Sequence, residues 1–195
     1  MKSICVYCGS SDKVNSIYLN VAREMGALIA KKGLKLIYGA GSTGLMGAVA
    51  NGALEMGGEV VGVLPEMFDT PQLAHGGLTR LEVVADMHTR KARIAELADG
   101  FIAMPGGFGT LEEFFEILTW AQIGLHSKPI GILNIGGYYG PLMTFMKKLE
   151  TEKFLYAGHN SLYVHSANPE RLLETMFQYQ PPDDLNRWVE REGKK

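Results

Sequence analysis

Residues 100–113, GFIAMPGGFGTLEE, constrain the fold more than any other stretch of this sequence. The apolar start predicts a buried strand, the proline and three glycines after it predict a tight loop, and the remaining residues begin a helix. A strand that enters a helix through a glycine loop is typical of α/β proteins. We therefore expect an α/β protein in which this loop has a special role.

The same loop has the chemistry of an anion site. Glycine lets the backbone approach a ligand closely, and the N–H groups in the first turn of a helix have no partner within the helix. Phosphate is the anion most often bound there. Glu112 and Glu113 follow within one turn, which predicts a carboxylate beside a phosphate. Acidic residues in a first turn also stabilise a helix by opposing its dipole, so the two glutamates alone do not establish a reaction.

Strand-like and helix-like segments alternate along the chain. Strands are expected at residues 2–8, 34–38, 59–64, 81–85, 100–104, 130–134 and 161–165, with helices between them that include 138–153. This alternation predicts a doubly wound parallel sheet, covered on both faces and joined by right-handed crossovers. With 195 residues, 46% of them hydrophobic, we expect one Rossmann-like α/β domain over residues 1–180 and a tail over 181–195.

Two further loops are expected at the carboxyl ends of strands, where open parallel sheets bind ligands. Residues 9–12 follow the first strand and supply Ser10. Residues 39–44, GAGSTG, fit the G-x-G-x-x-G pattern but follow the second strand. The acidic residue that a dinucleotide site needs at the end of the next strand is missing. We therefore expect a second glycine loop facing phosphate or ribose, and no nicotinamide site.

Residues 86–91, DMHTRK, concentrate charge at the end of the fourth strand. They fit either a substrate site or the exposed face of a helix. Residues 65–78 contain Pro, Gly and His without periodicity, which predicts a loop that covers a site, joins an interface or simply connects two elements.

Cys5 and Cys8 form a C-x-x-C pattern, but their odd separation in a strand points them to opposite faces. We expect no disulfide, zinc or redox role for them, and the five histidines lack the spacing of metal ligands. The net charge of −2 and the pI near 6.2 argue against a nucleic-acid partner. Without a signal-peptide pattern or an apolar run of about 20 residues, we expect a cytoplasmic protein with no membrane partner.

Three motifs occur in order along the chain: GLMG at 44–47, MHTRK at 87–91 and PGGFGTLEE at 105–113. Together they resemble the LOG family, the cytokinin riboside 5'-monophosphate phosphoribohydrolases, which are often labelled lysine decarboxylases. The resemblance extends over residues 2–165. It implies hydrolysis of the N-glycosidic bond of a nucleoside 5'-monophosphate, a homodimer, and no cofactor or metal.

The resemblance also implies roles for particular residues. Arg90 and Glu113 occupy the positions of the catalytic couple. The expected substrate-binding residues are Ser10, Met87, Lys91, Gly106, Gly107, Gly109, Thr110 and Glu112. Of these, the four residues from 106 to 110 would hold the 5'-phosphate. Glu112, together with Glu116, fits a structural carboxylate better than a substrate contact.

Two other functions compete with hydrolysis. Rossmann-like relatives with similar glycine loops bind nucleotides or the molybdenum cofactor as carriers, without hydrolysing them. A pyridoxal-phosphate lysine decarboxylase is disfavoured because the chain is short and has no evident Schiff-base lysine. Adenine, an N6-prenylated adenine and another purine all stay open as the base of the nucleotide substrate.

Overall fold

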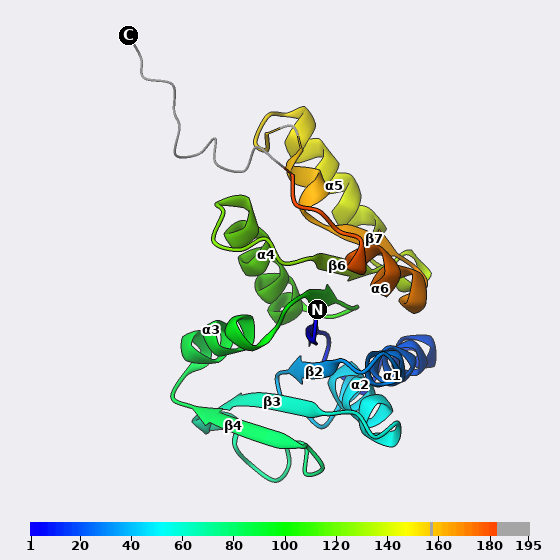
Figure 1. The fold of residues 1–195 in the computed structure, drawn as a ribbon, viewed down its shortest axis with the longest axis vertical. Coiled ribbons are helices and arrows are strands. Elements are labelled where there is room, and N and C mark those ends of the chain that lie inside the picture. Colours follow the sequence, from blue (N-terminus) through cyan, green and yellow to red (C-terminus); the bar gives the residue numbers. More distant parts are fainter. Residues whose placement is uncertain (157, 183–195) are drawn as a thin grey trace.

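The computed structural model describes residues 1–156 and 158–182, which form one parallel sheet of seven strands with helices on both faces (Figure 1). The strands are β1 (Ser3–Tyr7), β2 (Lys35–Tyr38), β3 (Val60–Pro65), β4 (Arg80–Val84), β5 (Phe101–Ala103), β6 (Ile130–Leu133) and β7 (Val164–Ser166). The helices are α1 (Ser16–Lys31), α2 (Gly44–Glu55), α3 (Met87–Leu97), α4 (Phe108–Gln122), α5 (Gly140–Thr151) and α6 (Pro169–Phe177).

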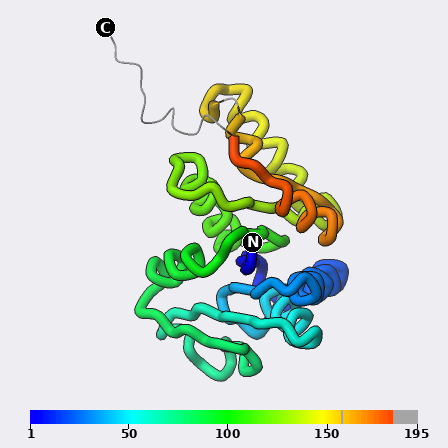
Figure 2. Tube along the Cα trace, in the orientation of Figure 1, coloured from blue at the N-terminus to red at the C-terminus, as the bar shows by residue number. Residues whose placement is uncertain are grey.

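The strand order is β4-β3-β2-β1-β5-β6-β7, and every pairing is parallel. The chain runs outward from β1 to β4, returns to the other side of β1 as β5, and runs outward again to β7. Figure 2 shows this path as a change from blue at the centre to cyan and green on one side and to orange on the other. The predicted doubly wound fold is confirmed. The order in which successive strands are added to the sheet reverses between β1 and β5.

The alternation of side chains in β1 divides the core into two layers. Ile4 and Val6 pack under α1, α2 and α6, whereas Cys5 and Tyr7 pack under α3, α4 and α5. Cys8 belongs to the first layer, so the two cysteines lie on opposite sides of the sheet, and both are free. This confirms that they form no disulfide.

Side-chain caps set the starts of three helices. Asn15 accepts a hydrogen bond from the N–H of Ile17, and Asn168 accepts one from the N–H of Arg171. Asp86 caps α3 by accepting from the N–H of Thr89 at 2.8 Å. This last cap matters for the site, because it fixes the start of the helix that carries Arg90.

The structure corrects two predicted boundaries near the carboxyl-terminal end. The last strand is Val164–Ser166 and not 161–165, because His159–Leu162 forms a 3₁₀ turn that buries Leu162 without a strand partner. The helix predicted at 138–153 spans Gly140–Thr151, since the two preceding glycines belong to the 3₁₀ turn Ile135–Gly137. Of the predicted tail, 181–182 are described and 183–195 lie outside the described residues.

The long loop between β3 and β4 folds back on the protein. It contains the 3₁₀ turn Glu66–Phe68, and Ala74 forms an isolated bridge with Gly41 in the loop after β2. His75 lies 3.0 Å from the Asn51 side chain of α2. Within the described ranges, no helix is both long and apolar enough to cross a membrane.

Candidate active site

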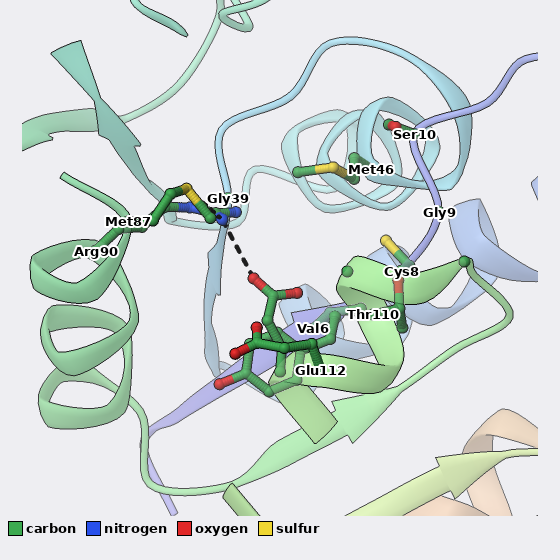
Figure 3. Close-up of a pocket in the computed structure, with 14 residues that line it drawn as sticks. Val6, Cys8, Gly9, Ser10, Gly39, Met46, Met87, Arg90, Thr110 and Glu112 are labelled. Carbon is green, nitrogen blue, oxygen red and sulfur yellow. Dashed lines mark hydrogen bonds and ion pairs between the residues drawn. The ribbon is translucent and has the colours of Figure 1, made fainter. Parts of the chain in front are cut away.

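A cavity of about 260 Å³ opens at the carboxyl ends of β1 and β5 (Figure 3). Its lining consists of Val6, Tyr7, Cys8, Gly9, Ser10, Gly39, Met46, Met87, Arg90, Gly107, Gly109, Thr110, Glu112 and Glu113. Tyr7 of β1 pairs with Ala103 of β5, so the loops that follow these two strands leave the sheet at the same level. This is the point where the strand order reverses, and doubly wound folds bind their ligands there.

The first turn of α4 presents unpaired N–H groups to this region. Among the described residues, no acceptor bonds to the N–H of Phe108, Gly109 or Thr110, and Gly107 precedes the helix without a side-chain cap. A Cβ atom built at position 107 or 109 would have no other part of the protein within 4 Å, apart from the adjoining chain. The helix therefore offers several donors and open space to an anion.

The N-terminus of α2 is closed by the protein itself. The carboxylate of Asp12 accepts from the N–H of Gly44 at 2.7 Å, and the carbonyl of Gly9 accepts from Leu45 at 2.9 Å and from Met46 at 3.3 Å. The N–H groups of Gly44, Leu45 and Met46, at the helix end of the loop 39–44, are therefore not free for a phosphate, and a contact of this loop with ribose stays a prediction. Of that stretch, Gly39 lines the cavity.

Arg90 is fixed by three contacts. Its Nε donates to the carbonyl of Val63 at 3.1 Å, while its Nη1 lies 3.2 Å from a carboxylate oxygen of Glu113 and 3.8 Å from the Met87 sulfur. The side chain is only 12% exposed. Figure 3 shows the dashed line from the guanidinium to the carboxylate across the cavity. Arg90 of α3 and Glu113 of α4, which come from two different motifs, therefore contact each other.

Gly39 makes room for this arginine. A Cβ built at this position would lie 1.8 Å from Arg90 Nη2, so any other residue would displace the guanidinium. Figure 3 shows Gly39 directly beside Arg90. Close approach to an arginine explains the glycine at the end of β2.

The carboxyl group of Glu113 has an unusual pKa. Burial raises its pKa to about 7, although the Arg90 charge opposes the shift and Glu112 adds to it. Its side chain is 12% exposed. A carboxyl group with a pKa raised in this way is suited to exchange a proton with a substrate or with water.

Lys91 points away from the couple to two other acids. Its Nζ lies 2.5 Å from Glu112 and 2.9 Å from Glu116, and its side chain is 11% exposed. The pKa of Lys91 is raised because the bonds to these two carboxylates outweigh its burial. Glu112 lines the cavity while pairing with this lysine, which supports the structural interpretation of Glu112 and Glu116.

A second hollow of about 330 Å³ lies on the other side of the glycine loop. It shares Gly9, Ser10 and Gly107 with the first cavity, and its other walls are mostly apolar. Tyr138 Oη donates to the carbonyl of Gly106 at 2.7 Å, and Tyr139 Oη donates to Met104 at 2.6 Å. Neither tyrosine was predicted from the sequence, although the GGYY sequence at 136–139 follows the end of β6, where ligands bind in open parallel sheets.

The structure brings most of the predicted residues together. Ser10, Met87, Arg90, Gly107, Gly109, Thr110, Glu112 and Glu113 all line the first cavity. Gly106 lines the second hollow and packs under Thr110. Lys91 does not line the first cavity but pairs with Glu112, which does. Among the described residues, no group of three or more His, Cys, Asp or Glu side chains could hold a metal ion.

Comparison with known sequences finds one family and close relatives. A family model described as "Possible lysine decarboxylase" matches residues 46–176. A cytokinin riboside 5'-monophosphate phosphoribohydrolase from Rhodococcoides fascians is 52% identical over 164 residues, which cover 84% of this chain and 83% of the relative. One from Arabidopsis thaliana is 41% identical over 183 residues, with 94% and 84% covered.

Solved structures share the fold at lower identity. The molybdenum cofactor carrier protein from Chlamydomonas reinhardtii superposes with a TM-score of 0.70 at 24% identity, covering 91% of this chain and 96% of that one. The molybdenum cofactor binding protein from Rippkaea orientalis gives a TM-score of 0.70 at 22% identity, covering 91% and 97%. At these identities the likeness concerns the fold alone.

Proposed function

Since the chain belongs to the family that includes the cytokinin riboside 5'-monophosphate phosphoribohydrolases, we propose that it hydrolyses the N-glycosidic bond of a nucleoside 5'-monophosphate. The products are a free base and ribose 5-phosphate. The observation that carries this proposal is the ion pair of Arg90 and Glu113, 3.2 Å apart in a cavity that also holds the open N-terminus of α4. The start of α4 can bind the phosphate, and the adjacent pair of Arg90 and Glu113 can contact the sugar.

The 5'-phosphate binds at the start of α4. The N–H groups of Phe108, Gly109 and Thr110 donate to its oxygens, and the helix dipole favours the negative charge. This contact fixes the ribose beside Glu113, which lies one turn further along the same helix. The phosphate thus positions the bond to be broken.

Hydrolysis then proceeds by loss of the base from C1'. As that bond breaks, its electron pair goes to the base and positive charge develops on the sugar, which the Glu113 carboxylate stabilises. Water adds to C1' and gives its proton to Glu113, which passes it to the departing base. Arg90 keeps its proton and holds Glu113 and substrate oxygens in place.

We propose a purine nucleotide as substrate, either AMP or a cytokinin-type derivative. The test is to incubate the protein with purine and pyrimidine nucleoside monophosphates and with the matching nucleosides, and to follow free base by chromatography. Base released from a purine monophosphate supports the proposal. No base from any monophosphate would contradict it.

The same assay separates hydrolysis from the carrier alternative. A nucleotide or molybdenum-cofactor carrier would release no adenine from AMP, and the pairing of Arg90 with Glu113 favours the enzyme over the carrier. A lysine decarboxylase would need a lysine at its cofactor. Lysine is absent among the described residues that line the cavity, and Lys91 directs its ammonium to Glu112 and Glu116.

We also propose a homodimer that forms over α3 and α4. These helices border a groove of about 350 Å³ lined by Ala92, Ala95 and Trp120, among others. Leu125 at its edge is 67% exposed. The lining also includes Glu96, His126 and Lys128, and a second copy of the chain would cover its apolar part. The cytoplasmic location stays a prediction that cell fractionation would test.

A further inference from the structure

We infer that Tyr138 is a positioning residue of the phosphate site, because its hydroxyl group holds the peptide between Gly106 and Gly107 in one orientation. In that orientation the Gly107 N–H points away from Tyr138 and is free to donate to phosphate. The inference rests on the proposed function, and it assigns a specific task to a residue outside the three motifs.

The geometry of one peptide links the two groups. Tyr138 Oη donates to the Gly106 carbonyl at 2.7 Å. A trans peptide is planar, and its C=O and N–H point in opposite directions. The N–H of this peptide belongs to Gly107, which bonds to no acceptor among the described residues and lines the first cavity. A hydrogen bond at one end of the peptide therefore fixes the donor at the other end.

This peptide needs an external restraint because it joins two glycines. No Cβ on either side resists a peptide flip, and Gly107, now at φ −91°, could take the positive φ that a flip would give it. A flipped peptide would direct a carbonyl oxygen to the side where the N–H now points. Phosphate would then lose a donor and meet a repelling dipole.

Tyr138 is 43% exposed, and its position is restrained by the preceding turn and by two ring contacts. Gly136 and Gly137 have φ values of 58° and 75°, a left-handed turn that delivers the tyrosine to the glycine loop. Its ring meets Tyr18 edge-on at 5.8 Å and Tyr139 at 4.9 Å. The hydroxyl group thus has a defined position and can act as a fixed donor.

Tyr139 provides a matched control. Its hydroxyl makes the same type of bond, to the Met104 carbonyl at 2.6 Å. The residue that follows Met104 is Pro105, which has no N–H. Loss of this bond would loosen the same region without misdirecting a phosphate donor.

The experiment compares wild type, Tyr138→Phe and Tyr139→Phe. AMP binding is measured by calorimetry, base release is measured with AMP and with adenosine, and thermal melting confirms the fold. For Tyr138→Phe we expect AMP affinity to fall about tenfold, the equivalent of one charge-assisted hydrogen bond. Its kcat/KM for adenosine should stay within about twofold of wild type, because adenosine has no phosphate. Tyr139→Phe should melt earlier and keep its AMP affinity.

Each other outcome decides against a defined claim. Wild-type AMP affinity in folded Tyr138→Phe, or an equal loss of affinity in Tyr139→Phe, would overturn the inference. An equal loss of activity toward adenosine would do the same. Wild-type protein that binds AMP but releases no base from any purine monophosphate would overturn the proposed hydrolysis alone, while the calorimetric comparison still decides the role of Tyr138. Wild-type protein that binds no purine monophosphate would overturn both.

Discussion

Single residues explain why the couple of Arg90 and Glu113 is preorganised. Arg90 is held by the Val63 carbonyl as well as by Glu113, and both charged side chains are 12% exposed. Burial makes their mutual attraction stronger than it would be in water. Burial also raises the pKa of Glu113 to about 7, so the cost of an ionised carboxylate is paid in folding and not during the reaction.

The raised pKa of Glu113 predicts the pH dependence of the reaction. If the carboxylate is the active form, kcat/KM for AMP should increase with pH up to about 7 and then level off. Below that value it should fall by about tenfold per pH unit. The residual activity of Glu113→Gln should not fall in this way at low pH. A fall that persisted in the variant would instead come from titration of the substrate phosphate. A flat wild-type profile from about pH 5 to 8 would show that Glu113 does not titrate in this role.

Gly39→Ala tests the placement of Arg90 without changing a charged group. The added methyl group would occupy the space of Arg90 Nη2. We expect kcat/KM for AMP to fall by at least about tenfold while the melting temperature changes by only a few degrees. For comparison, removal of the guanidinium itself in Arg90→Ala should lower both AMP affinity and turnover. Full activity of Gly39→Ala would mean that the arginine tolerates a different position.

The helices and strands explain why two similar glycine loops have different roles. The start of α2 is closed by Asp12 and Gly9, whereas the start of α4 is open. From the sequence, the two glycine loops, the strands before them and the helices after them were predicted correctly. It could not distinguish the two loops, because the acceptors that close α2 lie more than 30 positions earlier in the chain and reach it only through the fold.

The open N-terminus of α4 predicts that the 5'-phosphate is required. Each charge-assisted hydrogen bond to the phosphate contributes about 1.5–3 kcal/mol. If two are lost, kcat/KM for adenosine should be lower than that for AMP by about a hundredfold or more. Parallel assays of the two substrates measure this ratio. Equal rates would show that α4 does not bind phosphate.

The protein as a whole combines a predictable scaffold with contacts that only the fold creates. The alternation of strand-like and helix-like segments was enough to predict the doubly wound sheet. The three motifs identified Arg90 and Glu113 as candidate catalytic residues. The bond of Tyr138 to Gly106 could not be predicted because it joins elements 32 positions apart. The short last strand was misplaced because a 3₁₀ turn buries an apolar residue as effectively as a strand does.

The groove that Trp120 and the exposed Leu125 line beside α3 and α4 predicts self-association. Light scattering at micromolar concentration should give about twice the mass of the 21.4 kDa chain. Leu125→Arg should shift the protein toward the monomer, because a charge would be buried at the contact. A monomeric wild-type protein with full activity would contradict the proposed dimer.

Glu113→Gln tests the central claim most directly. The amide keeps the shape of the side chain but cannot stabilise positive charge on the sugar or accept a proton from water. With AMP binding followed by calorimetry and adenine release by chromatography, turnover should fall by roughly 10²- to 10⁴-fold while AMP affinity changes little. A folded Glu113→Gln variant that releases adenine at nearly the wild-type rate would contradict the catalytic role of Glu113.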